Sequence, residues 1–135
     1  MMEAGVLLGP NNSVIHWHTP NSRSGGALPD SRDLWDIIWE NRAIVTGFAH
    51  THPGSGAPGP SYTDTTTFAA IEAALGKHLN WFILSSDSQV ICLFDNEKGT
   101  YGRYIITVEL NTPMDLEWMS KLREFSNYSV QSKVA

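Results

Sequence analysis

The sequence predicts a single α/β domain, in which a mixed central β-sheet is flanked by helices. The first observation is that apolar residues recur with period two in some segments and at helical spacing in others. The second is Gln89–Asp95, where apolar side chains point both ways, as in a central strand covered on both faces. A length of 135 residues fits one domain. We assign residues 1–126 to this domain and residues 127–135 to a polar C-terminal tail.

The N-terminal part predicts two strands, a helix and a third strand. Ala4–Gly9 is an apolar run that ends at the turn signal Gly-Pro-Asn-Asn. Val14–Thr19 alternates, which places Ile15 and Trp17 together on the face opposite to two histidines. Ser31–Asn41 has apolar residues at helical spacing, behind a capping serine or aspartate. Ala43–His50 is again typical of a strand.

The C-terminal part begins with a loop, because Pro53–Pro60 consists largely of glycine and proline. A helix is predicted over Tyr62–Leu75, and Gly76 stands where a C-cap glycine belongs. Three strands and a last helix are predicted after it: Asn80–Ser85, Gln89–Asp95, Arg103–Leu110 and Asp115–Ser126.

Composition excludes several classes of protein. A net charge of −5 argues against nucleic acid or an anionic membrane as the main partner. The single cysteine, Cys92, excludes an intrachain disulfide and a cysteine-rich zinc knuckle, and its apolar strand predicts a core residue. No apolar run reaches the ~20 residues of a membrane span, and the N-terminus lacks the features of a signal peptide. We therefore expect a cytoplasmic protein.

A candidate metal site begins where a predicted strand ends. His50 and His52 lie two residues apart, so an extended chain places both imidazoles on one side, about 7 Å apart at the backbone. Catalytic zinc commonly takes three ligands from histidine and carboxylate side chains. Asp64, twelve residues beyond His52, is the candidate third ligand, because the intervening loop can turn the chain back. Ser61, one helical turn before Asp64, would place a hydroxyl near the same point.

Each part of this pattern has a structural alternative. A His-x-His pair is more often part of a half-exposed sheet face than of a metal site. Ser61 and Asp64 also fit a helix N-cap with an acid in the first turn. A second pair, His16 and His18, is a rival for the metal, but it has no Ser-x-x-Asp nearby and can instead line a substrate groove.

The motifs together resemble a known family. HTHP at residues 50–53, followed by SYTD at 61–64, resembles the signature of the JAMM zinc metalloproteases, also called MPN-type or JAB-domain proteins. EAGVLLG at residues 3–9 is similar to that family's upstream glutamate segment, shortened by one residue. The resemblance covers about residues 3–110. It implies an MPN/JAB-like, cytidine-deaminase-like topology, in a compact prokaryotic or phage-like member.

The resemblance also implies roles for individual residues. His50, His52 and Asp64 would bind one Zn²⁺ per chain, and Glu3 would be the general acid/base that acts on the zinc-activated water. Ser61 would donate a hydrogen bond to the oxyanion as it forms. The implied activity is hydrolysis of a peptide or isopeptide bond, with a peptide or a ubiquitin-like protein conjugate as substrate.

Several alternatives remain open from the sequence. Glu40 and Glu109 are substitutes for Glu3 as the base. The Asn96–Gly102 turn is too short for the insertion with which deubiquitinating members grip ubiquitin, which favours a peptide or small conjugate. The alternative function is a non-catalytic MPN scaffold that completes its sheet with a partner. A chain starting at Met1 leaves the Ala4–Gly9 strand or its neighbour at an exposed edge, so we expect a homodimer or a partner chain that covers it.

Overall fold

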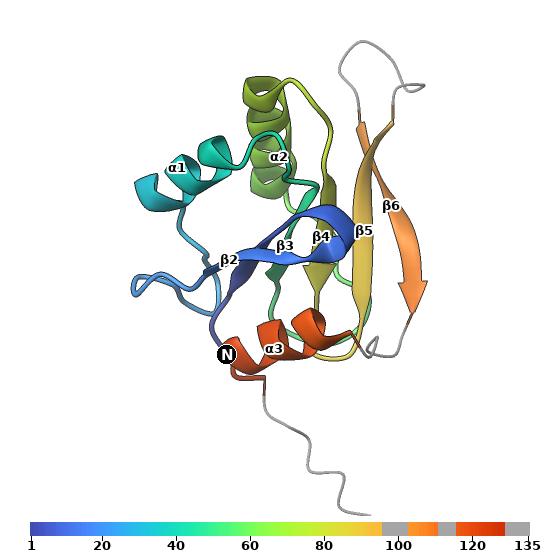
Figure 1. Ribbon diagram of the computed structural model, residues 1–135. Coiled ribbons are helices and arrows are strands. Elements are labelled where there is room, and N and C mark those ends of the chain that lie inside the picture. The colour runs from blue at the N-terminus through green and yellow to red at the C-terminus, as the bar shows by residue number, and fades with distance from the viewer. Residues whose placement is uncertain (96–102, 111–115, 129–135) are drawn as a thin grey trace, which may run out of the picture.

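The computed structural model describes residues 1–95, 103–110 and 116–128. Within them, six strands form one sheet in the order β2-β1-β3-β4-β5-β6 (Figure 1). β3 and β4 are parallel, and every other neighbouring pair is antiparallel. The strands are β1 Gly5–Leu8, β2 Val14–His18, β3 Gly47–Thr51, β4 Asn80–Leu84, β5 Gln89–Asp95 and β6 Arg103–Leu110. The helices are the short η1 Pro10–Asn12 and α1 Arg32–Glu40, α2 Tyr62–Leu75 and α3 Glu117–Phe125.

The helices form a layer on each face of the sheet. α1 and α2 cover one face and α3 covers the other (Figure 1). On the first face, Leu34 of α1 and Phe68 of α2 pack with Trp81 of the sheet. On the second, α3 contributes Trp118, Met119 and Leu122 to a separate core. The predicted α/β class, with a mixed sheet flanked by helices, is confirmed.

β5 is covered on both faces, as its apolar sequence predicts. It lies between β4 and β6. Val90 and Cys92 belong to the core under α1 and α2, while Ile91 packs against the core under α3. Cys92 is fully buried, and this burial raises the pKa of its thiol to about 11. Its burial makes Cys92 a core residue. A thiol that stays protonated is also a poor nucleophile.

Two details of the predicted strands are wrong. The strand predicted from Ala43 begins only at Gly47, because the chain first turns: the N–H groups of Ile44 and Val45 both donate to the carbonyl of Asn41. Ile15 and Trp17 do not share a face. The pairing of β1 with β2 shifts register next to Leu7, so Ile15 packs in the core of α1 and α2 while Trp17 packs in the core of α3. Such an irregularity breaks the period-two alternation.

The N-terminal edge of the sheet is formed by β2. β1 lies between β2 and β3, so its backbone is paired on both sides, and β2 has a neighbouring strand on one side only among the described residues. Of the two strands that the sequence left open as the edge, the edge strand is therefore β2 and not β1. A homodimer or partner chain that covers this edge stays a prediction.

Two predictions fall wholly or partly outside the described residues. The Asn96–Gly102 turn lies outside them, as does most of the 127–135 tail. Tyr128 is described, and its hydroxyl donates to the backbone carbonyls of His52 and Leu84. None of the helices in the described part of the chain is both long and apolar enough to cross a membrane.

Candidate metal centre

The two histidines lie at the carboxyl end of β3. His50 pairs with Ile83 in the parallel β3–β4 ladder, and the N–H of His52 continues it by donating to the carbonyl of Leu84 at 2.8 Å. Because side chains alternate along a strand, both imidazoles project from the same face. Their ring centroids are 4.8 Å apart, and their Nε2 atoms are 3.0 Å apart. The predicted convergence of the pair is present.

The loop after His52 is fastened so that α2 starts next to the histidines. Gly54 and Gly56 have φ angles of +92° and +83°, which favour glycine. The carbonyl of Gly54 accepts from the N–H of Ser86, and the carboxylate of Asp87 accepts from the N–H of Gly56 at 2.7 Å. The hydroxyl of Ser85 donates to the carbonyl of Gly56 at 2.7 Å. These bonds hold the loop against the β4–β5 turn.

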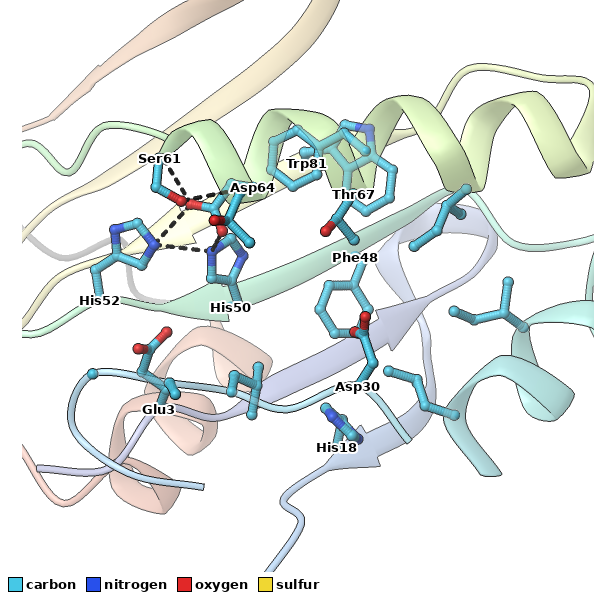
Figure 2. A pocket seen from close by; sticks show the side chains of 18 of the residues that line it. Glu3, His18, Asp30, Phe48, His50, His52, Ser61, Asp64, Thr67 and Trp81 are labelled. Carbon is cyan, nitrogen blue, oxygen red and sulfur yellow. Dashed lines mark hydrogen bonds and ion pairs between the residues drawn. The ribbon is translucent and has the colours of Figure 1, made fainter. Parts of the chain in front are cut away.

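Ser61 and Asp64 cap α2 and face the histidines at the same time. The N–H of Asp64 donates to Oγ of Ser61, and the N–H of Ser61 donates to Oδ2 of Asp64, so the two residues form a capping box. The same carboxylate places Oδ1 3.2 Å from Nε2 of His50 and Oδ2 3.0 Å from Nε2 of His52 (Figure 2). The capping and ligand interpretations are therefore compatible.

The donor set fits a zinc-sized ion. One atom from each of His50, His52 and Asp64 lies within 4.8 Å of the others. Among the described residues, these three form the group of histidine, cysteine and carboxylate side chains that could hold a metal ion. Tetrahedral zinc with bonds of about 2.0–2.2 Å keeps its ligand atoms roughly 3.3–3.6 Å apart. The two Nε2 atoms lie 3.0 Å apart, a few tenths less than this, and each of them lies 3.0–3.2 Å from a different oxygen of the Asp64 carboxylate. Small outward movements would therefore admit the ion, and two imidazoles with a carboxylate suit zinc chemically.

Asp64 is held in its anionic form. Its partial burial would raise the pKa of the carboxyl, but hydrogen bonds from His50 and His52 and from the N–H of Ser61 keep that pKa well below its usual range. The carboxylate is therefore ionised near neutral pH, which is the state that a metal ligand requires.

Glu3 reaches the same cavity through the register of β1 with β3. Gly5 lies opposite His50 in this antiparallel pair, so two residues earlier Glu3 comes opposite His52 and on the same face. Glu3 is only 8% exposed, and Figure 2 shows its carboxylate pointing into the cavity, on the side opposite Asp64. Burial raises the pKa of Glu3, although His52 and His50 oppose the shift. Glu3 thus lines the site without belonging to the ligand group.

The backbone around Glu3 is fixed by long-range hydrogen bonds. Oγ1 of Thr51, the residue between the two histidines, accepts from the N–H of Ala4 at 2.9 Å. The guanidinium of Arg23 donates to the carbonyls of Glu3 at 3.2 Å and of Phe125 at 2.8 Å. The N–H of Glu3 donates to the carbonyl of Ser24 at 2.8 Å. The segment is held by β3, by α3 and by the loop before α1.

The other candidate residues lie apart from this group. His18 is buried, and its Nε2 donates to the carbonyl of Pro29 at 2.8 Å. It lines the cavity, whereas His16 does not. Glu40 is exposed at the end of α1. Glu109 belongs to β6, which β4 and β5 separate from β3, and its side chain lies outside the described residues.

The cavity has a volume of about 540 Å³, and the sequence motifs mark only one end of it. Its remaining lining includes Phe48, Thr67 and Ile71. One signal for Phe48 is present in the sequence, because it precedes His50 by two residues and must share its face of the strand. Thr67 and Ile71 follow Thr63 at intervals of four, which aligns them on one side of α2.

Comparisons with known proteins add no assignment. No family model matches the chain, and no curated protein matches it.

Proposed function

We propose that the chain is a zinc-dependent metallopeptidase that hydrolyses a peptide or isopeptide bond. The observation that carries the proposal is the arrangement of two separate groups in one cavity. One is the ligand set His50, His52 and Asp64, and the other is the buried carboxylate of Glu3. Hydrolysis of an amide by a metal site needs a set of metal ligands and also a general base that is not itself a metal ligand.

His50, His52 and Asp64 would hold the ion. Three protein ligands leave the fourth tetrahedral position open, which distinguishes catalytic from structural zinc sites. When bound, zinc polarises a carbonyl and makes water acidic enough to act as a nucleophile near neutral pH. The ligands come from the end of β3 and from the capped first turn of α2, two rigid elements joined by a fastened loop.

Glu3 would move the proton. Its carboxylate accepts a proton from the attacking water, and then delivers that proton to the amine nitrogen as the C–N bond breaks, so that the carboxylate is regenerated. Burial raises the pKa of Glu3, which brings it closer to the range in which one group serves as both base and acid. Hydrogen bonds that join the backbone of residues 3 and 4 to Thr51, Arg23 and Ser24 hold the segment that carries this carboxylate.

Ser61 would stabilise the oxyanion. Its Oγ accepts the N–H of Asp64, and among the hydrogen bonds of the described residues its own hydroxyl hydrogen has no acceptor. Ser61 is exposed and lines the cavity beside the ligands, so this hydrogen can be donated to the substrate. Removing one oxyanion donor of this kind typically costs ~3–4 kcal/mol of transition-state stabilisation.

Two measurements test the proposal. Protein purified without chelator is analysed for metals by atomic spectroscopy, and cleavage of a fluorogenic peptide amide and of an isopeptide-linked pair is followed before and after removal of the metal. We expect one zinc per chain and cleavage that chelation abolishes and zinc restores. Stoichiometric zinc without any cleavage would instead favour the non-catalytic scaffold, and a chain that binds no zinc would overturn the proposal.

A further inference from the structure

The cavity continues beyond the metal ligands along the sheet. Two residues back along β3 from His50 stands Phe48, which pairs with Trp81 of β4. Seven residues along α2 from Asp64, about 10 Å along the helix axis, stands Ile71. Phe48, Trp81 and Ile71 line the cavity, as do Leu34 and Ile38 of α1. We call these five residues the apolar end of the cavity.

The floor of the apolar end depends on a glycine. A Cβ atom at Gly5 would lie 2.6 Å from Cζ of Phe48, so only glycine lets this ring lie over β1. The ring is half-buried, and Figure 2 shows it between the metal ligands and His18. Residues two apart on a strand are separated by about 7 Å, so the apolar end begins about that far from His50. If the scissile bond of a substrate lies at the metal ligands, the side chain of the residue next to that bond can reach the apolar end.

The walls of the apolar end come from two helices. α2 presents Thr67 and Ile71, and α1 presents Leu34 and Ile38, each pair four residues apart and so on one side of its helix. Few polar groups interrupt this surface. Nε2 of His18 already donates to the carbonyl of Pro29, and Asp30 is exposed.

We propose that the apolar end binds a leucine- or phenylalanine-sized side chain of the substrate residue next to the cleaved bond. This inference rests on the proposed function, and it names the substrate class. A cavity of about 540 Å³ holds such a side chain together with the reacting amide. The carboxylates of Glu3, Asp30 and Asp64 disfavour an acidic side chain. A lysine would lose the hydration of its ammonium group against Phe48 and Ile71, because Glu3 and Asp64 lie at the metal end of the cavity and Asp30, the carboxylate that Figure 2 shows near Phe48, is exposed to solvent.

Binding to the metal-free protein tests the inference independently of catalysis. The probes are N-acetyl amino-acid amides of glycine, alanine, leucine, phenylalanine, lysine and glutamate, followed by NMR of the isoleucine methyl groups. We expect the leucine and phenylalanine amides to shift the methyls of Ile38 and Ile71, and to bind at least about tenfold more tightly than the alanine amide. The methyls of Ile44, which is exposed outside the cavity, should not shift. Equal affinities, or tightest binding of the lysine or glutamate amide, would overturn the inference.

Variants locate the bound side chain. Ile71→Trp fills the apolar end and should weaken binding of the leucine amide at least about tenfold, whereas Ile44→Trp on the surface should not. Thr67→Phe provides a second blocking variant if Ile71→Trp does not fold. Unchanged binding in a folded blocking variant would contradict the inference.

Cleavage of a matched peptide series separates the two proposals. With zinc bound, we expect kcat/KM for peptides with leucine or phenylalanine beside the scissile bond to exceed that for alanine at least about tenfold. Selective amide binding without any cleavage would support the apolar end and overturn the proposed function alone. Cleavage of all peptides at equal rates would overturn the inference and leave the proposed function standing.

Discussion

The hydroxyls of Thr51 and Ser126 lie 2.7 Å apart and join β3, which carries the candidate metal ligand His50, to the end of α3. Thr51 projects away from the cavity, because it stands between two histidines that project into it. Both residues are fully buried, and Oγ of Ser126 also lies 3.1 Å from the carbonyl of Leu122. Since Oγ1 of Thr51 accepts the N–H of Ala4, one side chain connects the ligand strand, the Glu3 segment and α3.

Thr51→Val should therefore destabilise the protein and misplace Glu3. Valine has nearly the shape of threonine but leaves the buried N–H of Ala4 without its acceptor, which typically costs ~1–3 kcal/mol. We expect that loss in the free energy of unfolding measured with urea, together with slower cleavage at unchanged zinc content. The control is Thr66→Val, where an exposed hydroxyl donates only to the carbonyl of Tyr62 within α2. Equal stability of the two variants would show that the Thr51 hydroxyl is dispensable.

Zinc binding should depend on His50 and not on His16. His50→Ala removes one of three converging atoms and leaves His52 and Asp64, too few for a tight site. We expect zinc to be lost on gel filtration of His50→Ala and retained by His16→Ala, with metal content measured by atomic spectroscopy. The opposite result would move the site to the other histidine pair.

The grouping of His50, His52 and Asp64 could be predicted from the sequence because each step was local. The period of a strand places His50 and His52 on one side, and a capping signal places Asp64 in the first turn of a helix. The position of Glu3 could not be derived in this way. It follows from the pairing of Gly5 with His50, 45 positions away, and only the family resemblance pointed to it.

The remaining differences have the same cause. A register shift beside Leu7 separates Ile15 from Trp17, and no residue in the alternating pattern marks it. The bond between Thr51 and Ser126 joins residues 75 positions apart, so it depends on how α3 packs across the sheet. Local patterns thus predicted most of the elements and the convergence of three candidate ligands, whereas contacts between distant segments determined how the site is supported.

Stability should decrease as the pH is lowered, because His18 is buried in its neutral form. Burial lowers the pKa of this imidazole, although its hydrogen bond to the carbonyl of Pro29 opposes the shift. A folded-state pKa below the ordinary value of about 6.5 means that the neutral form stabilises the fold. This contribution is fully present above pH 6.5 and is lost as pH falls through the lower folded-state value. Urea unfolding of the metal-free protein at pH 7.5 and 5.5 should therefore show a smaller loss in His18→Gln than in the parent, and equal losses would contradict the assignment.

Glu72 should be a structural carboxylate with no part in the metal site. It is 5% exposed, and its Oε2 accepts from the N–H of Leu79 at 2.7 Å and from Nε1 of Trp81 at 2.9 Å. Its Oε1 accepts from the hydroxyl of Tyr104. Glu72→Gln replaces one acceptor oxygen by a donor, so buried donors lose their partner. We expect a loss of about 3 kcal/mol in the free energy of unfolding.

The matched control for Glu72 is Glu40→Gln. Glu40 is exposed at the end of α1, so its substitution should change the free energy of unfolding by no more than about 0.5 kcal/mol. Zinc content should be unchanged in both variants. Loss of zinc from folded Glu72→Gln would instead connect this carboxylate to the metal centre.

Glu3→Gln should separate proton transfer from metal binding. Glu3 lines the cavity but is not one of the three converging ligands, so the variant should keep its zinc and its fold. Glutamine has the size of glutamate but cannot accept a proton near neutral pH. General acid–base catalysis is typically worth ~100–10,000-fold, so we expect kcat to fall at least about 100-fold, with KM little changed because the lost interaction is made only in the transition state. Glu40→Gln, on the exposed end of α1, should cleave like the parent. If Glu3→Gln cleaves as fast as the parent while zinc stays bound, Glu3 is not the base.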